Sequence, residues 1–435
     1  MKNGMLNMSA NSKNCAVYLP AINSNYASTL TSGLPIGRQF PSGISPVDLA
    51  FWGLDSKLWH YPYLLHSVGQ YKVGSDPVNA ITSRRSNDGI LFGDSAGYQI
   101  GIGSLKGLTG LESGMSGDDA FHAWRQSGHV REWIVSWLET YTNYAMTIDM
   151  PLWATLPHGA RSPFHKCSEE QLRALTVENL QFIERHRQGR TKWLNVIQGL
   201  DTEGMINWWS AVNWFDCSGY SFSAKGVEKN GLTALLEPLL KMRDRNAFSA
   251  KRSWVHLLGC STVPWAVVCT AIQRGLQISV GEGARVSFDS SSPLIQGSRY
   301  ENYVEIPSLG SHICNWKIPE NEAPKGPALV GSKEPLPFSS PLADRLTIGD
   351  LNVREGKYLH KQFDRFSYLF LMNHNIWVYL RSFDLANEMA FSAQRSQIPG
   401  KYRRCIEIVE EAFKTESWHQ LLLSEKTLLD SFNGS

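Results

Sequence analysis

The chain has 435 residues, of which 42% are hydrophobic, and its formal net charge is +2. This length and apolar content suffice for one large domain with its own core, and the small net charge argues against a surface that is basic throughout. No apolar run reaches the ~18 residues of a membrane span, so we expect no membrane partner. The polar residues 1–15 lack the apolar stretch of a signal peptide and predict a loose tail on a cytoplasmic protein.

Cysteine usage argues against disulfides and against a thiolate zinc site. The seven cysteines are scattered and form no CxxC or CxC pair. His158, His165 and Cys167 are the nearest approach to a metal-binding cluster, and we interpret them as solvated or structural side chains of one loop-like stretch. The residues by themselves therefore predict no metal and no cofactor.

Six segments repeat one pattern: a short β-prone run, then polar or charged residues, then a helical stretch. Strands that alternate with helices form parallel sheets, and this many units over roughly 250 residues favours an α/β fold, the (β/α)8 TIM barrel. An open, doubly wound sheet is the alternative. No GxGxxG or GxxxxGK[ST] motif follows any of these runs, so no phosphate-binding loop is indicated. The segments span residues 89–99, 144–149, 193–199, 219–223, 254–259 and 286–289.

Helical patterns fill the intervals and the end of the chain. Residues 168–187 combine an N-terminal capping signature at Ser168 with apolar residues at helical spacing. Prolines are too dense for regular elements in residues 319–345, which we expect to form a long loop. The predicted organisation is a TIM-barrel catalytic domain over residues 1–318, this Pro-rich loop, and a C-terminal helical part over 346–435 that packs on the barrel, with helices at 357–375, 376–393 and 401–426.

Four local clusters of basic residues stand out against the small net charge. Cations are favoured at solvated helix faces and helix C-termini, which accounts for any single cluster. A nucleic-acid groove assembled from several of them stays open as an alternative. The clusters are Arg84 with Arg85 and residues 185–192, 241–252 and 401–404.

Polar side chains follow the predicted strands at Asp94, Asp149, Gln198 and Asp289. In a barrel of parallel strands the residues after each strand gather on one rim, so we expect these side chains around a common mouth. Carboxylates accept hydrogen bonds from ring and exocyclic N–H groups, and an amide both donates and accepts, which suits a planar, nitrogen-rich heterocycle. Two carboxylates can also cleave an N-glycosidic bond, one as nucleophile at the anomeric carbon and the other as acid and base.

A series of short motifs resembles the tRNA-guanine transglycosylase family. DSAGYQ at residues 94–99 resembles the family's DSGGFQ, and FDSS at 288–291 resembles its nucleophile motif, FDCV. The motifs occur in the family's order across residues 89–380. The other similar stretches are TIDMPLW around Asp149, NVIQG at 195–199, HLLG at 256–259 and HNIWVY at 374–379.

The resemblance implies an enzyme that exchanges a nucleic-acid base through a covalent glycosyl-enzyme intermediate, with no metal at the base. It implies that Asp289 is the nucleophile and Asp94 the general acid and base. Tyr98 and Leu258 would sandwich the base between them. The other residues that the resemblance assigns to base binding are Asp149, Gln198, Ser95 and Gly199.

The chain departs from the family pattern at three places, two of which move the expected substrate from tRNA to DNA. No cysteine lies between Cys314 and Cys405, so the zinc ligands expected upstream of His374 are missing and we expect no structural zinc. Ser-Ala at residues 223–224 replaces an expected Gly-Gly pair, so the backbone contact that the family makes with the base there is not carried over to this chain. Residues 291–294 (SSPL) lack the arginine of the stretch that in the family meets the tRNA anticodon loop.

The pattern is most similar to the DNA-guanine transglycosylases of bacteriophages and bacteria, which protect DNA from restriction by inserting a 7-deazaguanine such as 7-cyano-7-deazaguanine. The resemblance implies DNA and a 7-deazaguanine base as partners, the host cytoplasm as the location of a phage-encoded chain, and a target guanine that leaves the base stack. The basic clusters would then hold the DNA backbone. The alternatives are a tRNA-guanine transglycosylase with a degenerate zinc site, a non-catalytic barrel subunit that binds nucleic acid, and an unrelated barrel lyase or aldolase.

Overall fold

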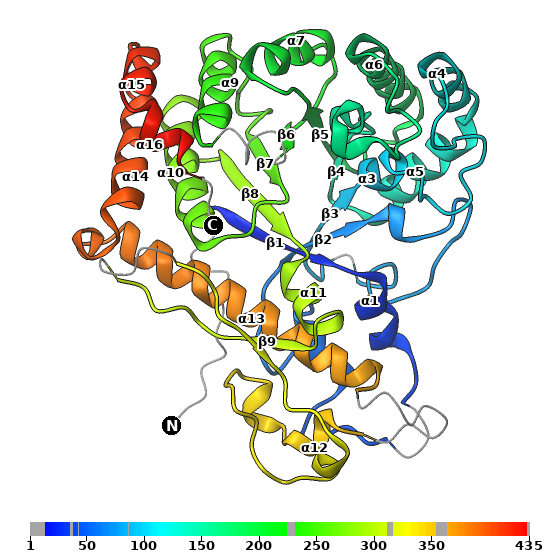
Figure 1. The fold of residues 1–435 in the computed structure, drawn as a ribbon, viewed down its shortest axis with the longest axis vertical. Coiled ribbons are helices and arrows are strands. Elements are labelled where there is room, and N and C mark those ends of the chain that lie inside the picture. Colours follow the sequence, from blue (N-terminus) through cyan, green and yellow to red (C-terminus); the bar gives the residue numbers. More distant parts are fainter. Residues whose placement is uncertain are drawn as a thin grey trace.

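Eight parallel strands close into a barrel, and helices surround it (Figure 1). In order around the barrel the strands are β1 (Val17–Ile22), β2 (Tyr63–Ser67), β3 (Ile90–Asp94), β4 (Tyr144–Met146), β5 (Lys192–Ile197), β6 (Gly219–Ser223), β7 (Trp254–Leu258) and β8 (Arg285–Ser290). The predicted (β/α)8 TIM barrel is thereby confirmed, and the open sheet is excluded. The computed structural model describes residues 14–34, 38–41, 43–85, 87–223, 231–310, 316–353 and 363–432, so residues 1–13 of the predicted tail lie outside the described part.

All six predicted segments form barrel strands, but the sequence patterns missed β1 and β2. β1 contains Pro20, which argues against a strand because proline has no N–H to donate to a ladder. Pro20 lies opposite Ser290 of β8, whereas pairing with β2 begins only after it, at Ala21 and Ile22, so the ladder with β2 does not require an N–H from residue 20. β2 is a short run between two irregular segments, with no helical pattern before it to mark a repeat.

The helices run between the strands and continue beyond β8. The helices that connect successive strands are α1 (Ser24–Thr31), α2 (Pro46–Leu49), α3 (Gly97–Gly101), α4 (Gly117–Gln126), α5 (Gly128–Tyr141), α6 (Glu169–His186), α7 (Thr202–Val212), α9 (Thr233–Asp244) and α10 (Val263–Val280). Those after β8 are α11 (Ser292–Ser298), α12 (Ile348–Leu351), α13 (Arg365–Ala390), α14 (Gly400–Ala412), α15 (Trp418–Ser424) and α16 (Lys426–Asp430). In the part of the chain that the structure describes, no helix combines the length and apolar character needed to cross a membrane.

The predicted capping signature is present at the start of α6. Ser168 Oγ accepts from the backbone N–H of Gln171 at 3.2 Å, and Gln171 Oε1 accepts from the backbone N–H of Ser168 at 2.8 Å. These reciprocal bonds satisfy backbone donors that the first turn leaves free. Leu172 and Ile183 are buried on the face that packs toward the barrel, as their spacing predicted.

The barrel has two cores because its parallel strands are buried on both faces. Inward side chains fill the barrel with a small cluster that includes Phe92, Val196 and Trp254. Outward side chains pack under the helices in a much larger cluster, to which Val286 and Phe288 of β8 belong. Alternate residues of a strand point to opposite faces, so each strand contributes to both cores.

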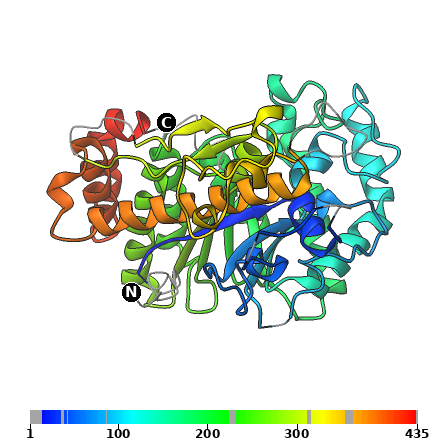
Figure 2. The same ribbon diagram turned by 90° about the horizontal axis from the view of Figure 1, so that it is seen from below.

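Helix α13 runs along the outside of the barrel, next to α11 and β9 (Figures 1 and 2). Two predicted helices, 357–375 and 376–393, meet in this one helix, so the predicted break is wrong; residues 354–362 lie outside the described part. Polar side chains inside α13 do not end it because they are buried and bonded. Asn375 Oδ1, for example, accepts from the backbone N–H of Val304 at 3.0 Å.

The start of α13 is held by a buried ion pair. Asp364 caps the helix by accepting from the backbone N–H groups of Phe366 and Ser367, and Arg38 Nε lies 3.2 Å from its carboxylate. Both charged side chains are almost fully buried, so each needs the other.

The end of the chain is more divided than predicted. Residues 401–426, expected as one helix, belong to α14, α15 and the start of α16, because the chain leaves α14 where Phe413 packs on Gly275 of α10. The Pro-rich residues 319–345 include a short strand, β10 (Glu320–Glu322), which pairs antiparallel with β9 (Asn302–Val304), and two 3-10 turns, Pro327–Leu329 and Ala343–Arg345.

Candidate active site

A cavity of about 300 Å³ opens at the C-terminal end of the barrel. The residues that line it are Leu65, Asp94, Gly97, Tyr98, Asp149, Pro151, Trp153, Gln198, Ser223, Leu258, Gly259 and Asp289. All four polar residues that we placed on one rim from the sequence are among them, together with the predicted stacking residues Tyr98 and Leu258. The cavity has the size and the mixed polar and apolar lining of a site for a small planar ligand.

Strand periodicity explains why these polar groups meet. Phe92 of β3 and Val196 of β5 belong to the inner core. Two residues later on each segment, the next inward position is Asp94 after Phe92 and Gln198 after Val196. In the same way Asp289 is the last inward residue of β8. The inner core is therefore apolar in the middle of the barrel, and the layer above it is polar and forms the floor of the cavity.

Asp289 is held through one of its two oxygens. Oδ1 accepts from the backbone N–H of Gly259 at 2.8 Å and lies 3.4 Å from Nε2 of His256. Gly259 has φ 78°, a left-handed conformation that glycine adopts without strain, and this turns its N–H toward the carboxylate. Among the described residues no group donates to Oδ2, so one carboxylate oxygen is fixed and the other is free to react.

Asp94 sits beside Asp289 with an elevated pKa. Burial raises the pKa of its carboxyl most, a hydrogen bond from Ser67 opposes this, and the nearby charge of Asp289 raises it further. A raised pKa favours the protonated carboxyl, which is the form that an acid needs in order to donate a proton. The geometry adds the second difference, because Asp289 has one oxygen held by the Gly259 N–H.

Asp149 and Gln198 form a bonded pair on another wall of the cavity. Gln198 Nε2 donates to Asp149 Oδ2 at 2.5 Å. Burial raises the pKa of Asp149 to about 6, against the lowering effect of this hydrogen bond, and the charge of Asp94 adds to the rise. Since the pair uses one oxygen of Asp149 and the amide N–H of Gln198, Asp149 Oδ1 and Gln198 Oε1 are left to accept from a ligand.

Aromatic rings form the mouth of the cavity. The side chain of Tyr98 is 52% exposed, and its ring lies 5.6 Å from that of Trp153. Trp153 in turn stacks on His158, with ring centroids 6.2 Å apart. The mouth therefore offers flat surfaces on which a planar ligand can stack.

Two of the predicted base-binding residues have other roles. Ser95 is buried and donates through Oγ to the carbonyl of Thr147 at 3.0 Å, which ties the end of β3 to the segment after β4. At Gly199 a Cβ would lie 2.4 Å from the backbone nitrogen of Met205, so this glycine lets α7 approach β5 closely. Neither lines the cavity.

Sequence patterns assigned no role to His256 or to Trp153. His256 is part of the HLLG stretch, but it also lies two residues before Leu258 and therefore on the inward face of β7. This spacing is the signal that could have found it. Trp153 lies in a 3-10 turn, Leu152–Thr155, after β4 and ends the TIDMPLW stretch, but this motif pointed to Asp149 and gave Trp153 no role of its own.

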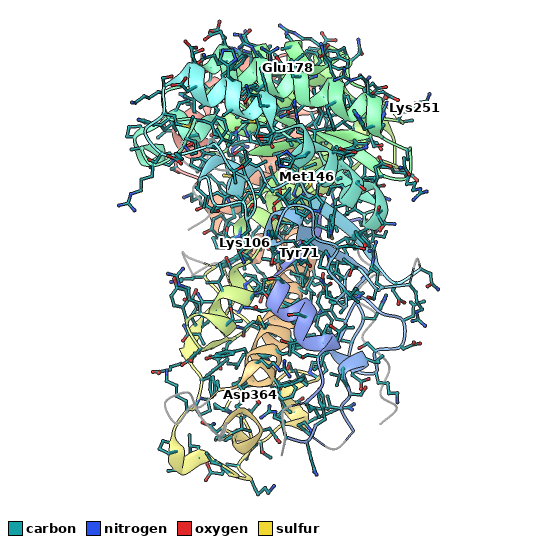
Figure 3. The ribbon with its side chains drawn as sticks, turned by 90° about the vertical axis from the view of Figure 1, so that its right-hand side faces the viewer. Tyr71, Lys106, Met146, Glu178, Lys251 and Asp364 are labelled. Carbon is teal, nitrogen blue, oxygen red and sulfur yellow. The ribbon has the colours of Figure 1, made fainter. Side chains whose placement is uncertain are left out.

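Three of the four basic clusters lie at the opposite end of the barrel. Arg84 and Arg85 precede β3, residues 185–192 lead into β5 and residues 241–252 lead toward β7. Figure 3 labels one residue of these clusters, Lys251, which lies well apart from Lys106 in the segment after β3. The expectation that these clusters hold a nucleic-acid backbone at the cavity is therefore not supported by their positions.

His374, His165 and Cys167 each contact a backbone carbonyl. His374, 1% exposed, contacts the carbonyl of Val304 through Nε2 at 3.0 Å, and burial lowers its pKa to about 4. His165 contacts the carbonyl of Ala154 at 3.1 Å, and Cys167 donates to that of Gly117 at 3.4 Å. No group of three or more His, Cys, Asp or Glu side chains suited to a metal occurs in the described ranges. Cys314, and Ala224 of the Ser-Ala pair that replaces the family's glycines, lie outside these ranges.

Comparisons with models of known protein families and with curated protein sequences find no match to this chain.

Proposed function

We propose that this protein is a DNA-guanine transglycosylase, which replaces guanine in DNA with a 7-deazaguanine. The observation that carries the proposal is the pairing of Asp289, held by one oxygen, with Asp94, whose pKa is raised, in one cavity that also contains Asp149 and Gln198. The ordered motifs that resemble the transglycosylase family supply the reaction class, because a set of carboxylates alone does not.

In the proposed first step Asp289 attacks the deoxyribose. Its carboxylate Oδ2 forms a bond to C1′ as the bond from C1′ to N9 of guanine breaks. Asp94 donates its proton to the departing base, which leaves as neutral guanine, and the sugar remains attached to Asp289 as an ester.

In the second step the incoming base reverses these events. Asp94, now a carboxylate, removes the proton from N9 of the 7-deazaguanine as N9 attacks C1′. The ester bond to Asp289 breaks, and both carboxyl groups return to their starting protonation states. Since one acid serves both half-reactions, a pKa raised above that of a free carboxyl suits Asp94.

Base recognition in this proposal depends on the acceptor oxygens that the bond between Gln198 and Asp149 does not use. Asp149 Oδ1 and Gln198 Oε1 both accept, and guanine and its 7-deaza analogues present adjacent N–H donors at N1 and at the exocyclic N2. Tyr98 and Leu258 line the cavity where they can cover the faces of the base. Buried acceptors also disfavour bases without these donors, because the acceptors would then stay unsatisfied.

The preference for DNA over tRNA depends on the segment C-terminal to Asp289. Residues 292–298 form α11, in which Pro293 and Leu294 are buried, and α11 packs on α13. This segment therefore contributes to the core and offers no cation to an anticodon loop. A base that reacts at the bottom of the cavity must also leave its helix stack, and the exposed ring of Tyr98 beside the partly buried ring of Trp153 suits an unstacked nucleotide.

Incubation with labelled guanine tests the proposal. We expect the purified protein to incorporate the label into duplex or melted DNA and not into tRNA, and a 7-deazaguanine to compete with it. Label in tRNA alone would identify a tRNA-guanine transglycosylase, and no label in either would leave a non-catalytic binding subunit. Nucleoside mass spectrometry of DNA from cells that express the protein and are supplied with a 7-deazaguanine then identifies the inserted base.

A further inference from the structure

A row of buried polar side chains lies inside the barrel beneath Asp289. Ser221, His256 and Ser287 are register partners on β6, β7 and β8, and Trp254 is the next inward residue below His256 on β7. His256 and both serines are fully buried, and Trp254 is 8% exposed. The row connects the apolar middle of the barrel to the carboxylate that the proposed reaction uses as nucleophile.

The hydroxyl of Ser287 determines which nitrogen of His256 carries the hydrogen. Trp254 Nε1–H donates to Ser287 Oγ at 2.7 Å, because an indole N–H can only donate. The Ser287 hydroxyl hydrogen then needs an acceptor, and among the described residues only His256 Nδ1, at 2.9 Å, is within reach. A hydrogen on Nδ1 would leave this buried hydroxyl unsatisfied, so Nδ1 accepts and the hydrogen of the neutral ring resides on Nε2.

We propose that His256 is a positioning residue for the nucleophile, fixed as the Nε2–H tautomer by the chain from Trp254 through Ser287. The Gly259 N–H holds Asp289 Oδ1 at 2.8 Å, and His256 Nε2 lies 3.4 Å from the same oxygen without a hydrogen-bond partner of its own among the described residues. In the proposal this contact becomes a hydrogen bond when substrate binds, so that both donors hold Oδ1 and leave Oδ2 for the reacting carbon.

A neutral donor is well suited to this task. It orients the carboxylate without a full positive charge beside it, so the carboxylate keeps its nucleophilic charge. The role of Oδ2 rests on the proposed function, whereas the tautomer of His256 is set by the hydrogen bonds of the free protein alone.

Nitrogen-15 NMR of the histidine side chains tests the tautomer without requiring activity. We expect the His256 signals, assigned by their loss in His256→Gln, to show a protonated Nε2 and an unprotonated Nδ1. Ser287→Ala should mix the two tautomers. Ser221→Ala is the matched control, since the Ser221 hydroxyl has no partner in the described part of the chain, and it should leave the signals unchanged. A protonated Nδ1 in the wild-type protein would overturn the inference, whatever the protein catalyses.

The pH dependence of base exchange tests the effect on Asp289. His256→Asn, whose amide reaches only the Nδ1 position, should lower kcat about tenfold with little change in KM for the base. It should also shift the acid limb of the rate profile up by about one pH unit, because a carboxylate that loses an N–H donor is protonated more readily.

His256→Gln carries an amide nitrogen near the Nε2 position and should restore most of the rate and of the acid limb. Equal losses in the Asn and Gln variants with an unshifted limb would reduce His256 to a packing residue and overturn its positioning role. If the wild-type protein exchanges no base in either nucleic acid, the proposed function fails, and the NMR measurement still decides the tautomer.

Discussion

Each end of the barrel carries a hollow. Cationic side chains line the hollow at one end, and carboxyl groups line the hollow at the other. The hollow at the N-terminal end has a volume of about 590 Å³ and is lined by Arg187, Lys192 and Lys251 among others. The cavity at the C-terminal end is about half as large, at about 300 Å³, and contains three carboxyl groups. Size and positive charge would favour the first as a nucleic-acid site.

The hydrogen bonds and the burial of the charges favour the second. Arg187 pairs with Glu184 at 2.8 Å, and Lys192 lies over the ring of Tyr144, 5.3 Å from its centroid. At the other end, burial raises the pKa values of Asp94 and Asp149, to which the charges of Asp289 and of Asp94 respectively add, and Asp289 keeps one oxygen without a described donor. Unused hydrogen-bonding capacity and desolvation therefore mark a reactive site better than the volume of a hollow or the number of its charges.

The largest effect is expected from Asp289→Asn. An amide cannot form the glycosyl ester, so base exchange should fall by about 10⁴-fold or more, measured as incorporation of labelled guanine into DNA. Lys192→Gln and Lys251→Gln, at the other end of the barrel, are the controls and should keep the wild-type rate. If exchange survives in Asp289→Asn, or is lost in the lysine variants, the active site does not lie in the C-terminal cavity but in the hollow at the N-terminal end.

Asp94→Asn should lower the same rate by about 10²- to 10⁴-fold, because an amide neither donates nor accepts a proton for the base. The matched control is Asp201→Asn on the same rim, where Asp201 accepts from the N–H of Gly204 at 2.8 Å and caps α7. This control should stay near the wild-type rate. Equal losses in the two variants would mean that any carboxylate on the rim matters, and not Asp94 in particular.

Asp149→Asn should stabilise the protein at neutral pH while weakening base binding. Folding raises the pKa of Asp149 from its usual 3.8 to about 6, so the folded state binds this proton more tightly and stability falls as pH rises from about 4 to about 6. An amide does not titrate, so Asp149→Asn avoids this cost of about 3 kcal/mol. The free energy of unfolding of the variant should exceed that of the wild type by this amount above pH ~6 and equal it below pH ~4. Urea unfolding of both proteins across this range checks the sign; an advantage that persists below pH ~4 would contradict it.

Gly199→Ala should have the smallest of these effects, a loss of about 1–3 kcal/mol in the free energy of unfolding. The added Cβ would lie 2.4 Å from the backbone nitrogen of Met205, so α7 must shift. Gly128→Ala is the control, because a Cβ there meets nothing within 4 Å. If the Gly199→Ala variant is fully stable but binds the base more weakly, Gly199 has a role in base binding and not in packing.

Local sequence patterns were enough to define the repeated unit and the polar ends of its strands. Six of the eight strands, the cap of α6 and the gathering of Asp94, Asp149, Gln198 and Asp289 are explained by periodicity and by the rule that parallel strands end on one rim. These features are local or depend on topology alone. Sequence patterns failed at β1, where the ladder with β2 begins only after Pro20 and needs no N–H from it, and at α13, whose buried asparagine is satisfied by a distant strand.

The role of each side chain at the rim, in contrast, depended on the packed barrel. Ser95 and Gly199 lie next to cavity residues in the chain but support packing, whereas His256 lies beneath Asp289 from another strand. Sequence could not separate these cases because burial, hydrogen-bond partners and the resulting pKa shifts come from groups far apart in the chain. Motif spacing identifies which residues can meet, and tertiary packing determines which of them keep a free oxygen or a proton.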